Sequence, residues 1–304
     1  MPLQDTPAKV DVHRTIAIET TSGAFTKMHY GEDVRVPYLW PVHGPGGVEM
    51  TRGFPMEKGR PNESTDHPHH TSLWFAHGSV NGHDFWHSKG RYPRVVVVAA
   101  PKVEKKDGGT TIVETTSEWR ATAEAIPLRE LRRTTFAESD GVRTIDFDLR
   151  LVALTDVRFG DTKEGTLAMR LRPELRLKGP VAQGSARDAD GRKDGELWGK
   201  RTAWLTYYGP VGERTVGVAV FDHPENLRHP TWWHARDYGL VAANPFGIHD
   251  FERKPAGTGD LELKQGKELR LRYRVTLFEG TPKLEDLDAA WRKWSKPPEG
   301  AKKD

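Results

Sequence analysis

Histidines concentrate in two short windows of this 304-residue sequence. Ten of the thirteen histidines lie in residues 66–87 and 222–251, whereas residues 88–221 contain none. A single His is more often structural than catalytic, but His side chains that converge can transfer protons near neutral pH or bind a metal ion. We therefore expect the function to reside in these two windows.

The first window reads DHPHHTSLWFAHGSVNGHDFW over residues 66–86. Side chains alternate along an extended segment, so only some of its histidines can face one site. We take His70 and His77 as acid–base candidates. Asn81, Asp84 and Trp86 are candidate substrate-binding residues, because a sugar packs its C–H face on an aromatic ring while its hydroxyls need polar partners.

The second window reads FDHPENLRHPTWWHARDYGLVAANPFG over residues 221–247, and its prolines interrupt regular strand pairing. His234 and Asp237 are candidate catalytic residues, a proton donor or acceptor with an acidic partner. Arg236 is a fixed cation for an anionic or enolate oxygen. An alternative is that Arg236 and Asp237 form an ion pair that only braces the loop. Trp233 and His223 are further candidates for substrate binding.

Imidazoles with a carboxylate could also hold one divalent metal ion, for which His67, His69, His77 and His234 are the candidate ligands. No HExxH motif supports this assignment, so it depends on clustering alone. The sequence has no cysteine, which excludes thiolate and disulfide chemistry. It also lacks the GxSxG, GxGxxG and GxxxxGK motifs, and no nucleotide cofactor is predicted.

Charge and hydropathy restrict the partners. The 46 basic and 43 acidic residues give a net charge of +3 and are mixed along the chain, which does not indicate a nucleic-acid partner. No run of eighteen apolar residues indicates a membrane span, and the N-terminus does not resemble an export signal. We expect a cytoplasmic protein whose partner is a small-molecule carbohydrate; the sequence leaves the oligomeric state open.

Period-two alternation of apolar residues dominates the rest of the chain and predicts β-strands joined by Gly, Asp and Pro turns. Residues 145–153 and 269–277 show the pattern most clearly, and residues 94–103 are a further candidate strand. One helix is predicted, over residues 283–296, where apolar side chains recur at helical spacing. The sequence predicts a mainly β protein: a large antiparallel sandwich with one C-terminal helix, forming a single domain over residues 1–296, and a disordered tail over 297–304.

The two windows resemble the signature blocks of the bacterial PmoA-like family of unknown function, and the resemblance extends from about Pro37 to Phe278. The family's label, a methane oxygenase subunit, conflicts with a sequence that has no membrane-spanning stretch. The resemblance implies a β-supersandwich like that of galactose mutarotase. That fold supports a sugar as substrate without defining the reaction.

These observations favour a carbohydrate-active enzyme with His/carboxylate acid–base catalysis. The reaction would be a lyase reaction, β-elimination on an oxidised, keto-type glycoside, or an epimerisation. One alternative is a non-catalytic sugar-binding protein that uses Trp side chains as platforms. Another is a metal-dependent hydrolase or oxygenase.

Overall fold

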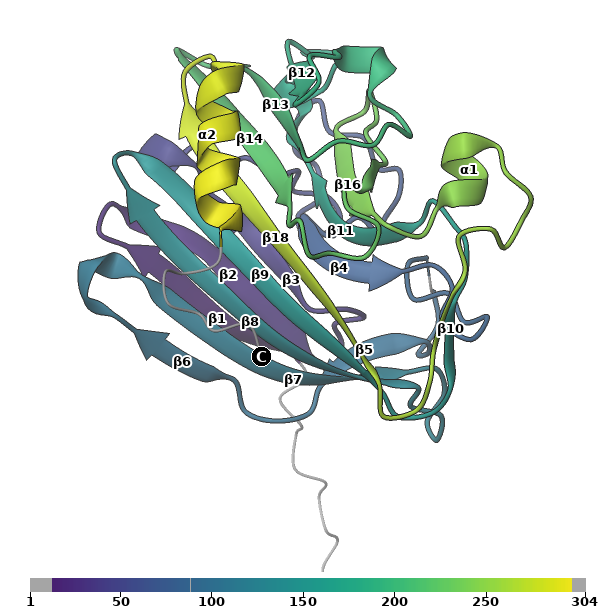
Figure 1. Cartoon of the computed structure of the whole chain (residues 1–304). Helices are drawn as coiled ribbons and strands as arrows, with labels where there is room; N and C mark the ends of the chain where they lie inside the picture. The colour runs from purple at the N-terminus through teal and green to yellow at the C-terminus, as the bar shows by residue number, and fades with distance from the viewer. Residues whose placement is uncertain (1–12, 88, 297–304) are drawn as a thin grey trace, which may run out of the picture.

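The computed structural model describes residues 13–87 and 89–296. The tail predicted to be disordered, residues 297–304, lies outside the described residues. Two large antiparallel sheets form the molecule, and a separate two-stranded ribbon extends from one end (Figure 1). The mainly β, antiparallel architecture predicted from alternation is confirmed.

The seven-stranded sheet has the order β1-β2-β3-β4-β11-β16-β15. Its strands are β1 (His13–Thr20), β2 (Gly23–Gly31), β3 (Tyr38–Val42), β4 (Leu73–His77), β11 (Gly165–Arg170), β16 (Leu240–Asn244) and β15 (Trp232–Trp233). The sheet joins segments from both ends of the chain. Both histidine windows contribute strands to it: β4 comes from the first, and β15 and β16 come from the second.

The nine-stranded sheet has the order β12-β13-β14-β18-β9-β8-β7-β5, with β6 also paired to β7. Its strands are β12 (Ser185–Asp188), β13 (Trp204–Val211), β14 (Arg214–Asp222), β18 (Glu268–Glu279), β9 (Val142–Ala153), β8 (Leu128–Ser139), β7 (Thr111–Arg120), β5 (Arg94–Val97) and β6 (Lys102–Lys105). The ribbon pairs β10 (Val157–Phe159) with β17 (Leu261–Leu263). Short 3-10 turns are η1 (Pro45–Gly47), η2 (Asp107–Gly109), η3 (Pro173–Leu175) and η4 (Asp194–Glu196).

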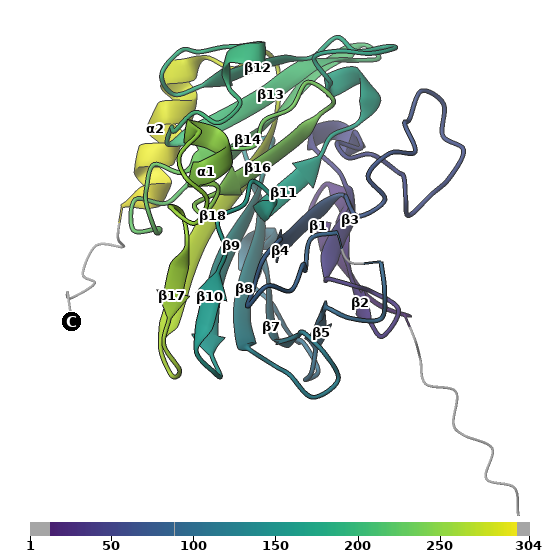
Figure 2. The same ribbon diagram turned by 90° about the vertical axis from the view of Figure 1, so that its right-hand side faces the viewer.

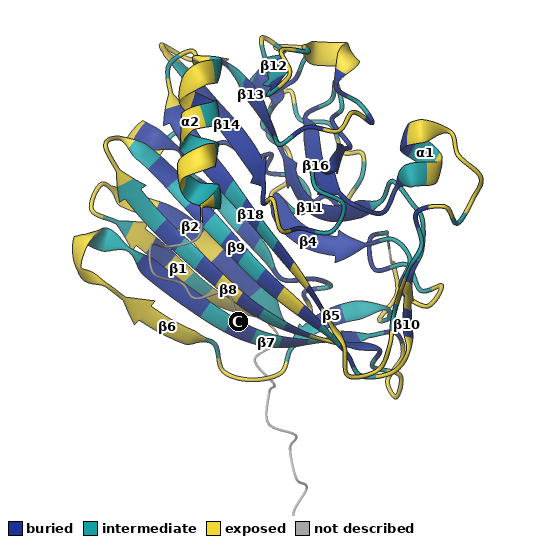
Figure 3. Cartoon of the chain, in the orientation of Figure 1, coloured by how far each residue is buried: buried dark blue, intermediate teal, exposed yellow. Residues whose placement is uncertain are grey.

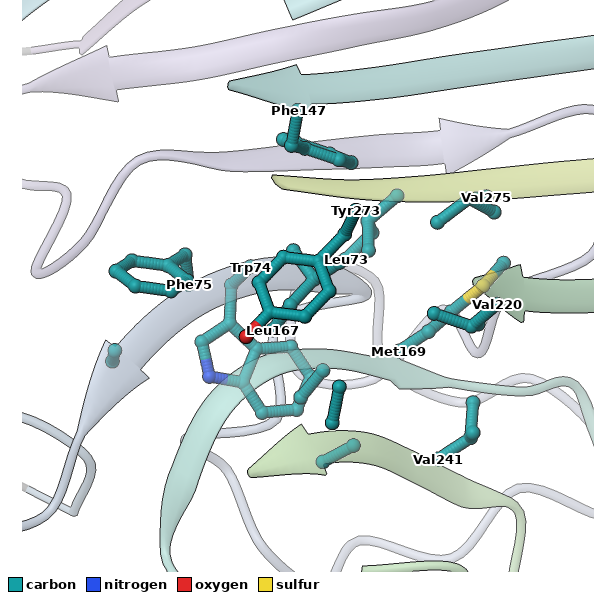
Figure 4. Packing of buried hydrophobic residues seen from close by; sticks show 14 of the residues in the cluster. Leu73, Trp74, Phe75, Phe147, Leu167, Met169, Val220, Val241, Tyr273 and Val275 are labelled. Carbon is teal, nitrogen blue, oxygen red and sulfur yellow. The ribbon is translucent and has the colours of Figure 1, made fainter. Parts of the chain in front are cut away.

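The hydrophobic core lies between the two large sheets. On β9, Phe147 and Leu149 belong to the alternating set that faces inward, and they are almost fully buried. They share one apolar cluster with Leu73 and Leu167 of the seven-stranded sheet (Figure 4). Burial of such side chains contributes roughly 1.5–3 kcal/mol each, which makes this layer the main source of stability.

The predicted C-terminal helix is confirmed as α2 (Leu284–Ser295). Its apolar side, including Leu287, packs on Trp204 and Phe221 on the outer face of the nine-stranded sheet (Figure 1). A second helix, α1 (Ile248–Glu252), was not predicted, because five residues are too few for a periodic pattern to show.

The strand predicted near Pro101 and the absence of a predicted membrane span can both be compared with the structure. The single strand predicted over 94–103 is two strands, β5 and β6, which are separated by residues 98–101. Pro101 lies in this break, and proline cannot donate a ladder hydrogen bond. Within the described parts of the chain, no helix has the length and apolar character needed to cross a membrane.

Candidate active site

The candidate site lies on the outer face of the seven-stranded sheet, opposite the core. On β11, Leu167 and Met169 belong to the core cluster. Arg170 follows them, and because strand side chains alternate, it points to the other face, where Trp74 of the neighbouring β4 also lies. Figure 2 shows β4, β11 and β16 side by side, with the loop before β4 on one side and α1 on the other.

Arg170 and Arg52 share one carboxylate, although both guanidinium groups are almost fully buried. Asp66 Oδ1 accepts from Arg52 Nη1 at 2.7 Å and from Arg170 Nη2 at 3.0 Å. Burial alone would raise the pKa of Asp66, but the charge of Arg170 and the hydrogen bonds from Ser64 and Arg52 outweigh it and hold the pKa well below the usual range. This network attaches the loop of the first window to the sheet.

Four imidazoles and one phenol form an aromatic group that we call the imidazole cluster: His67, His69, His70, His87 and Tyr238. The ring of His67 is stacked with those of His70, at 4.7 Å, and Tyr238, at 5.2 Å, and these two rings lie 6.5 Å from each other. His69 meets the rings of His70 and His87 edge-on, both at 4.5 Å. The two sequence windows therefore meet, since Tyr238 comes from the second and the histidines from the first.

The buried imidazoles of this cluster are neutral. Arg170 Nη1 donates to His70 Nδ1 at 3.1 Å, which leaves the His70 proton on Nε2. Burial lowers the pKa of His70 far below its ordinary value, and the charges of His69 and Arg170 add to the effect. Burial, followed by the charge of His87, lowers the pKa of His69 to about 3. Neutral imidazoles can act as hydrogen-bond donors and as bases at neutral pH.

His87 lies between two carboxylates. Its Nδ1 donates to Asp84 Oδ2 at 2.9 Å, and the backbone amides of Trp86 and His87 donate to Asp84 Oδ1. Its Nε2 lies 4.0 Å from Glu164 Oε2. Glu164 also pairs with Lys163 Nζ at 2.7 Å through its other oxygen. This arrangement orients a base and places a carboxylate next to it.

His234 adds a second oriented imidazole. Its Nδ1 donates to the carbonyl of Lys163 at 3.1 Å, so the lone pair is on Nε2. Burial lowers the pKa of His234 to about 4; the charge of Glu164 opposes this shift and the charge of Arg236 adds to it. His234 is therefore a neutral base close to the charges of Glu164 and Arg236.

Two guanidinium groups lie against the ring of Tyr238: Arg170 at 4.4 Å and Arg236 at 5.4 Å from its centroid. Burial raises the pKa of Tyr238, while the charges of Arg236 and Arg170 act in the opposite direction. The two cations would stabilise negative charge that develops on the phenol or on a bound oxygen. Arg236, a predicted substrate-binding residue, thus lies beside the cluster.

Asp237 and His77, two of the predicted catalytic residues, lie elsewhere. Asp237 is exposed in the turn before Tyr238, where its backbone carbonyl accepts the amides of Leu177 and Lys178. His77 is buried against Phe246, and its Nε2 donates to the carbonyl of Gly160 at 2.9 Å. Burial lowers the pKa of His77 to about 4. Its position in the packed layer explains its neutrality without a catalytic role.

The Trp platforms and Asn81 need correction. Trp86 and Trp233 have no exposed surface, so neither offers a face to a sugar. Trp86 packs against Trp74 beneath the imidazole cluster, and the indole of Trp233 donates to the carbonyl of Thr202. Asn81 joins the first window to β10 through hydrogen bonds to the backbone of Asp156 and Arg158. Of the predicted substrate-binding residues in the first window, Asp84 remains at the site.

His223 belongs to a different group, the Asp222 cluster, at the end of β14 beneath α2. The cluster consists of Asp222, His223, Asn226, His229 and Thr231. The fully buried Asp222 accepts from His229 Nδ1 at 2.6 Å, from Asn226 Nδ2 at 2.7 Å and from the Thr231 amide at 2.9 Å. His223 lies edge-on to Trp294 of α2. The second window is therefore divided between two places in the fold.

The metal-site prediction used His67, His69, His77 and His234. His67 and His69 are in contact within the imidazole cluster, whereas His77 is in the core layer. In residues 13–87 and 89–296, no three His, Cys, Asp or Glu side chains are arranged to hold a metal ion. The geometry of these residues thus gives no support to a metal centre.

Sequence reasoning missed Arg170, Glu164 and Tyr238 as functional candidates. Arg170 lies at a polar position of an alternating strand, where an arginine usually indicates a solvated face. Glu164 precedes that strand in a loop without a motif. Tyr238 carried a usable signal, because it lies in the second window next to Arg236.

Comparisons with solved structures give distant likenesses. A galactose mutarotase related enzyme from Lactobacillus acidophilus is 12% identical, with a TM-score of 0.37; the match covers 88% of this chain and 98% of that one. A galactose mutarotase-like protein from Lactobacillus casei ATCC 334 is 11% identical, with a TM-score of 0.41 and coverage of 87% and 100%. An alpha-galactosidase from Lactobacillus brevis is 10% identical, with a TM-score of 0.38, and 39% of it is covered by 87% of this chain.

With TM-scores below 0.5, these likenesses carry no conclusion about the activity of the chain. No curated protein matches the sequence. A family model described as a family of unknown function, DUF6807, matches residues 15–292, and the PmoA-like label finds no support in it. Because this match includes both sheets, both histidine windows and most of α2, the chain belongs to the DUF6807 family.

Proposed function

We propose that this chain is a carbohydrate-active enzyme that transfers protons on an oxidised sugar. The observation that carries the proposal is the contact between the two windows: His67 and His70 of the first pack against Tyr238 of the second. Arg236 lies against the same ring, and the neutral His234 is close to the charges of Arg236 and Glu164. Neutral His side chains of fixed tautomer are suited to removing a weakly acidic C–H proton. Nearby guanidinium groups are suited to stabilising the enolate oxygen that results.

The reaction we favour is β-elimination on a 3-keto glycoside. A base removes the proton from C2, and the electron pair of that C–H bond forms an enolate with the C3 carbonyl. The enolate then expels the glycosidic oxygen from C1, and an acid protonates this leaving group. The products are a conjugated enone and a free alcohol, so the sequence of steps needs no oxidant or reductant. An epimerase would use the same enolate and return the proton to the opposite face.

The residues divide naturally among these roles. His234 is the base, because its Nδ1 donates to the Lys163 carbonyl, which leaves the lone pair on Nε2. Tyr238 is the acid, because two guanidinium groups beside its ring stabilise the phenolate it becomes. Arg236 binds the enolate oxygen, and His70 offers an Nε2–H to a substrate oxygen. His77 and Asp237 have no part in this scheme, because they lie outside the cluster.

The test uses 4-nitrophenyl 3-keto-glucoside, whose elimination releases 4-nitrophenol and forms an enone, both of which absorb light. We expect the purified chain to release both products. His234→Asn and Tyr238→Phe should each lower kcat/KM by roughly 10²- to 10⁴-fold. His83→Asn is the matched control: this histidine lies in the first window, outside the imidazole cluster, and its loss should leave the rate unchanged.

Two results would contradict the elimination. If the wild-type chain forms neither product, it does not catalyse the elimination. If the C2 proton exchanges with deuterated solvent but no elimination follows, the epimerase reaction is favoured instead. Full activity of both His234→Asn and Tyr238→Phe would show that the reaction takes place at another site. Sugar binding without either reaction would favour the non-catalytic alternative.

A further inference from the structure

A second candidate site lies on the opposite side of the molecule, on the outer face of the nine-stranded sheet. Two cavities of about 620 Å³ and 240 Å³ adjoin there and share Arg133 and Asp148 as lining residues. We call them together the outer-face groove. Helix α2 covers only one end of this face, and half-buried and exposed residues follow β8 and β9 beyond it (Figure 3). The larger volume is in the range of small-molecule sites, about 300–1,000 Å³.

The groove has an aromatic wall at the end where α2 begins to cover the sheet. Trp294 of α2 lines it and is half-buried, so part of its indole remains accessible, in contrast to Trp86 and Trp233. His223 lies edge-on to Trp294 at 5.1 Å. The backbone amide of Glu225 donates to His223 Nδ1, which puts the ring proton of neutral His223 on Nε2. An indole face beside an N–H donor suits the mixed apolar and polar surface of a sugar.

The floor of the groove is charged, and its arginines are paired with carboxylates. Asp148 pairs with Arg270 at 2.6 Å, Glu268 with Arg150 at 2.7 Å, and Glu114 with Arg133. Each of these six side chains lines the larger cavity. A polyanion needs accessible cations, but each arginine that lines the groove is paired with a carboxylate, which leaves the two lysines, Lys102 and Lys296. Rows of carboxylates and guanidinium groups instead alternate hydrogen-bond acceptors with donors, as vicinal hydroxyl groups require.

From this combination we infer that the outer-face groove binds a neutral oligosaccharide of several sugar units, with one unit stacked on Trp294 and others hydrogen-bonded along β8, β9 and β18. The groove is separated from the imidazole cluster by the core layer and both sheets. It is therefore a binding site without a part in the proton transfers proposed above, and it does not rest on them.

The experiment is calorimetric titration of the full chain with cellotetraose, maltotetraose and laminaritetraose, and with tetragalacturonate as the acidic comparison. We expect at least one neutral tetrasaccharide to bind more tightly than the acidic one. Trp294→Ala should weaken that binding roughly tenfold, as expected for the loss of an aromatic contact. Asp148→Asn should weaken it roughly three- to tenfold through a lost charge-assisted hydrogen bond.

Controls separate this inference from folding defects and from the proposed activity. Glu104→Gln changes an exposed carboxylate of β6 that pairs with Lys106 outside the groove, and it should bind like wild type. Tyr238→Phe should also bind like wild type, whatever its activity. Asp148→Asn keeps the shape of the side chain if Trp294→Ala does not fold. Failure of all three neutral sugars to bind, tighter binding of tetragalacturonate, or unchanged binding in Asp148→Asn would overturn the inference.

Discussion

Around Asp222 three donors converge on one buried carboxylate, whereas around Tyr238 the imidazoles pack mainly against one another. Asp222 accepts three hydrogen bonds, from His229, Asn226 and the Thr231 amide. In the imidazole cluster, ring centroids lie 4.5–5.2 Å apart and cations lie against Tyr238. A satisfied buried network stabilises a loop, while adjacent neutral rings and unneutralised charge are more typical of a site that meets a ligand.

A histidine-rich sequence window is therefore not one functional unit. The chain from 222 to 240 supplies His229 to the first cluster and Tyr238 to the second. The two parts of this segment have similar residue types, and their positions in the fold determine which of them is structural. If the contrast is correct, substitutions in the Asp222 cluster should affect stability, and substitutions near Tyr238 should affect activity.

The largest effect should come from Asp222→Ala. The substitution leaves three buried donors without an acceptor, which should lower the free energy of unfolding by about 3–5 kcal/mol. Urea denaturation followed by circular dichroism measures it. A loss below about 1 kcal/mol, the scale of one ordinary hydrogen bond, would contradict the description of this cluster as a structural network.

A stability loss at acidic pH should follow from the buried neutral histidines. His77 and His234 have folded pKa values of about 4, against an unfolded value of 6.5, so the unfolded chain binds more protons between these values. Their contribution is complete above pH 6.5 and is lost as the pH falls toward 4, by about 3 kcal/mol for each residue.

Urea midpoints measured from pH 7.5 to 4.5 test this pH dependence. His77→Gln should give a flatter profile than wild type, because it removes one of the groups that must bind a proton on unfolding. A profile of the same slope in the variant would assign the titration to other residues.

His234→Asn and His229→Asn form a matched pair from the same window. The first should reduce kcat/KM on the 3-keto glycoside by roughly 10²-fold or more with little change in stability. The second should lower stability by about 1–3 kcal/mol, because it removes a donor to the buried Asp222, with kcat/KM retained in the folded fraction. Loss of stability in His234→Asn together with loss of activity in His229→Asn would contradict the division into a structural cluster and a candidate site.

Arg236→Gln should have a smaller effect on activity, roughly ten- to a hundredfold in kcat/KM, if the guanidinium stabilises an enolate oxygen. Its stability should be near that of wild type. Asp237→Asn, which changes the exposed neighbour, is the control and should alter neither activity nor stability. Equal activity losses in both variants would favour a structural role for the turn.

Much of the fold could be predicted from sequence because period-two alternation reports which face of a strand is buried. Phe147 and Leu149 on β9 alternate with charged residues, and α2 has helical spacing. Arg170 follows Leu167 and Met169 at a polar position of an alternating strand, which is typical of a solvent-facing side chain. Strand β11 is instead buried on both faces, and Arg170 is almost fully buried. Single-residue patterns do not report what covers a strand.

The candidate site stays a prediction. The structure brings parts of the two histidine segments together, and His70, Arg236 and Asp84 are at or beside the imidazole cluster. His234 lies near the charges of Arg236 and Glu164. Trp86 and Trp233 were assigned to a sugar because tryptophan is typical of sugar sites, yet both are buried. Whether an aromatic ring packs or is accessible depends on long-range contacts, which the sequence does not display.

Strand β11 has Leu167 and Met169 on its core side and Arg170 on the other side. One short segment therefore contributes both to the hydrophobic core and to the candidate site. An engineer seeking a new substrate should randomise residues 53–65 of the loop before β4 and leave both 165–170 and the Asp222 cluster unchanged.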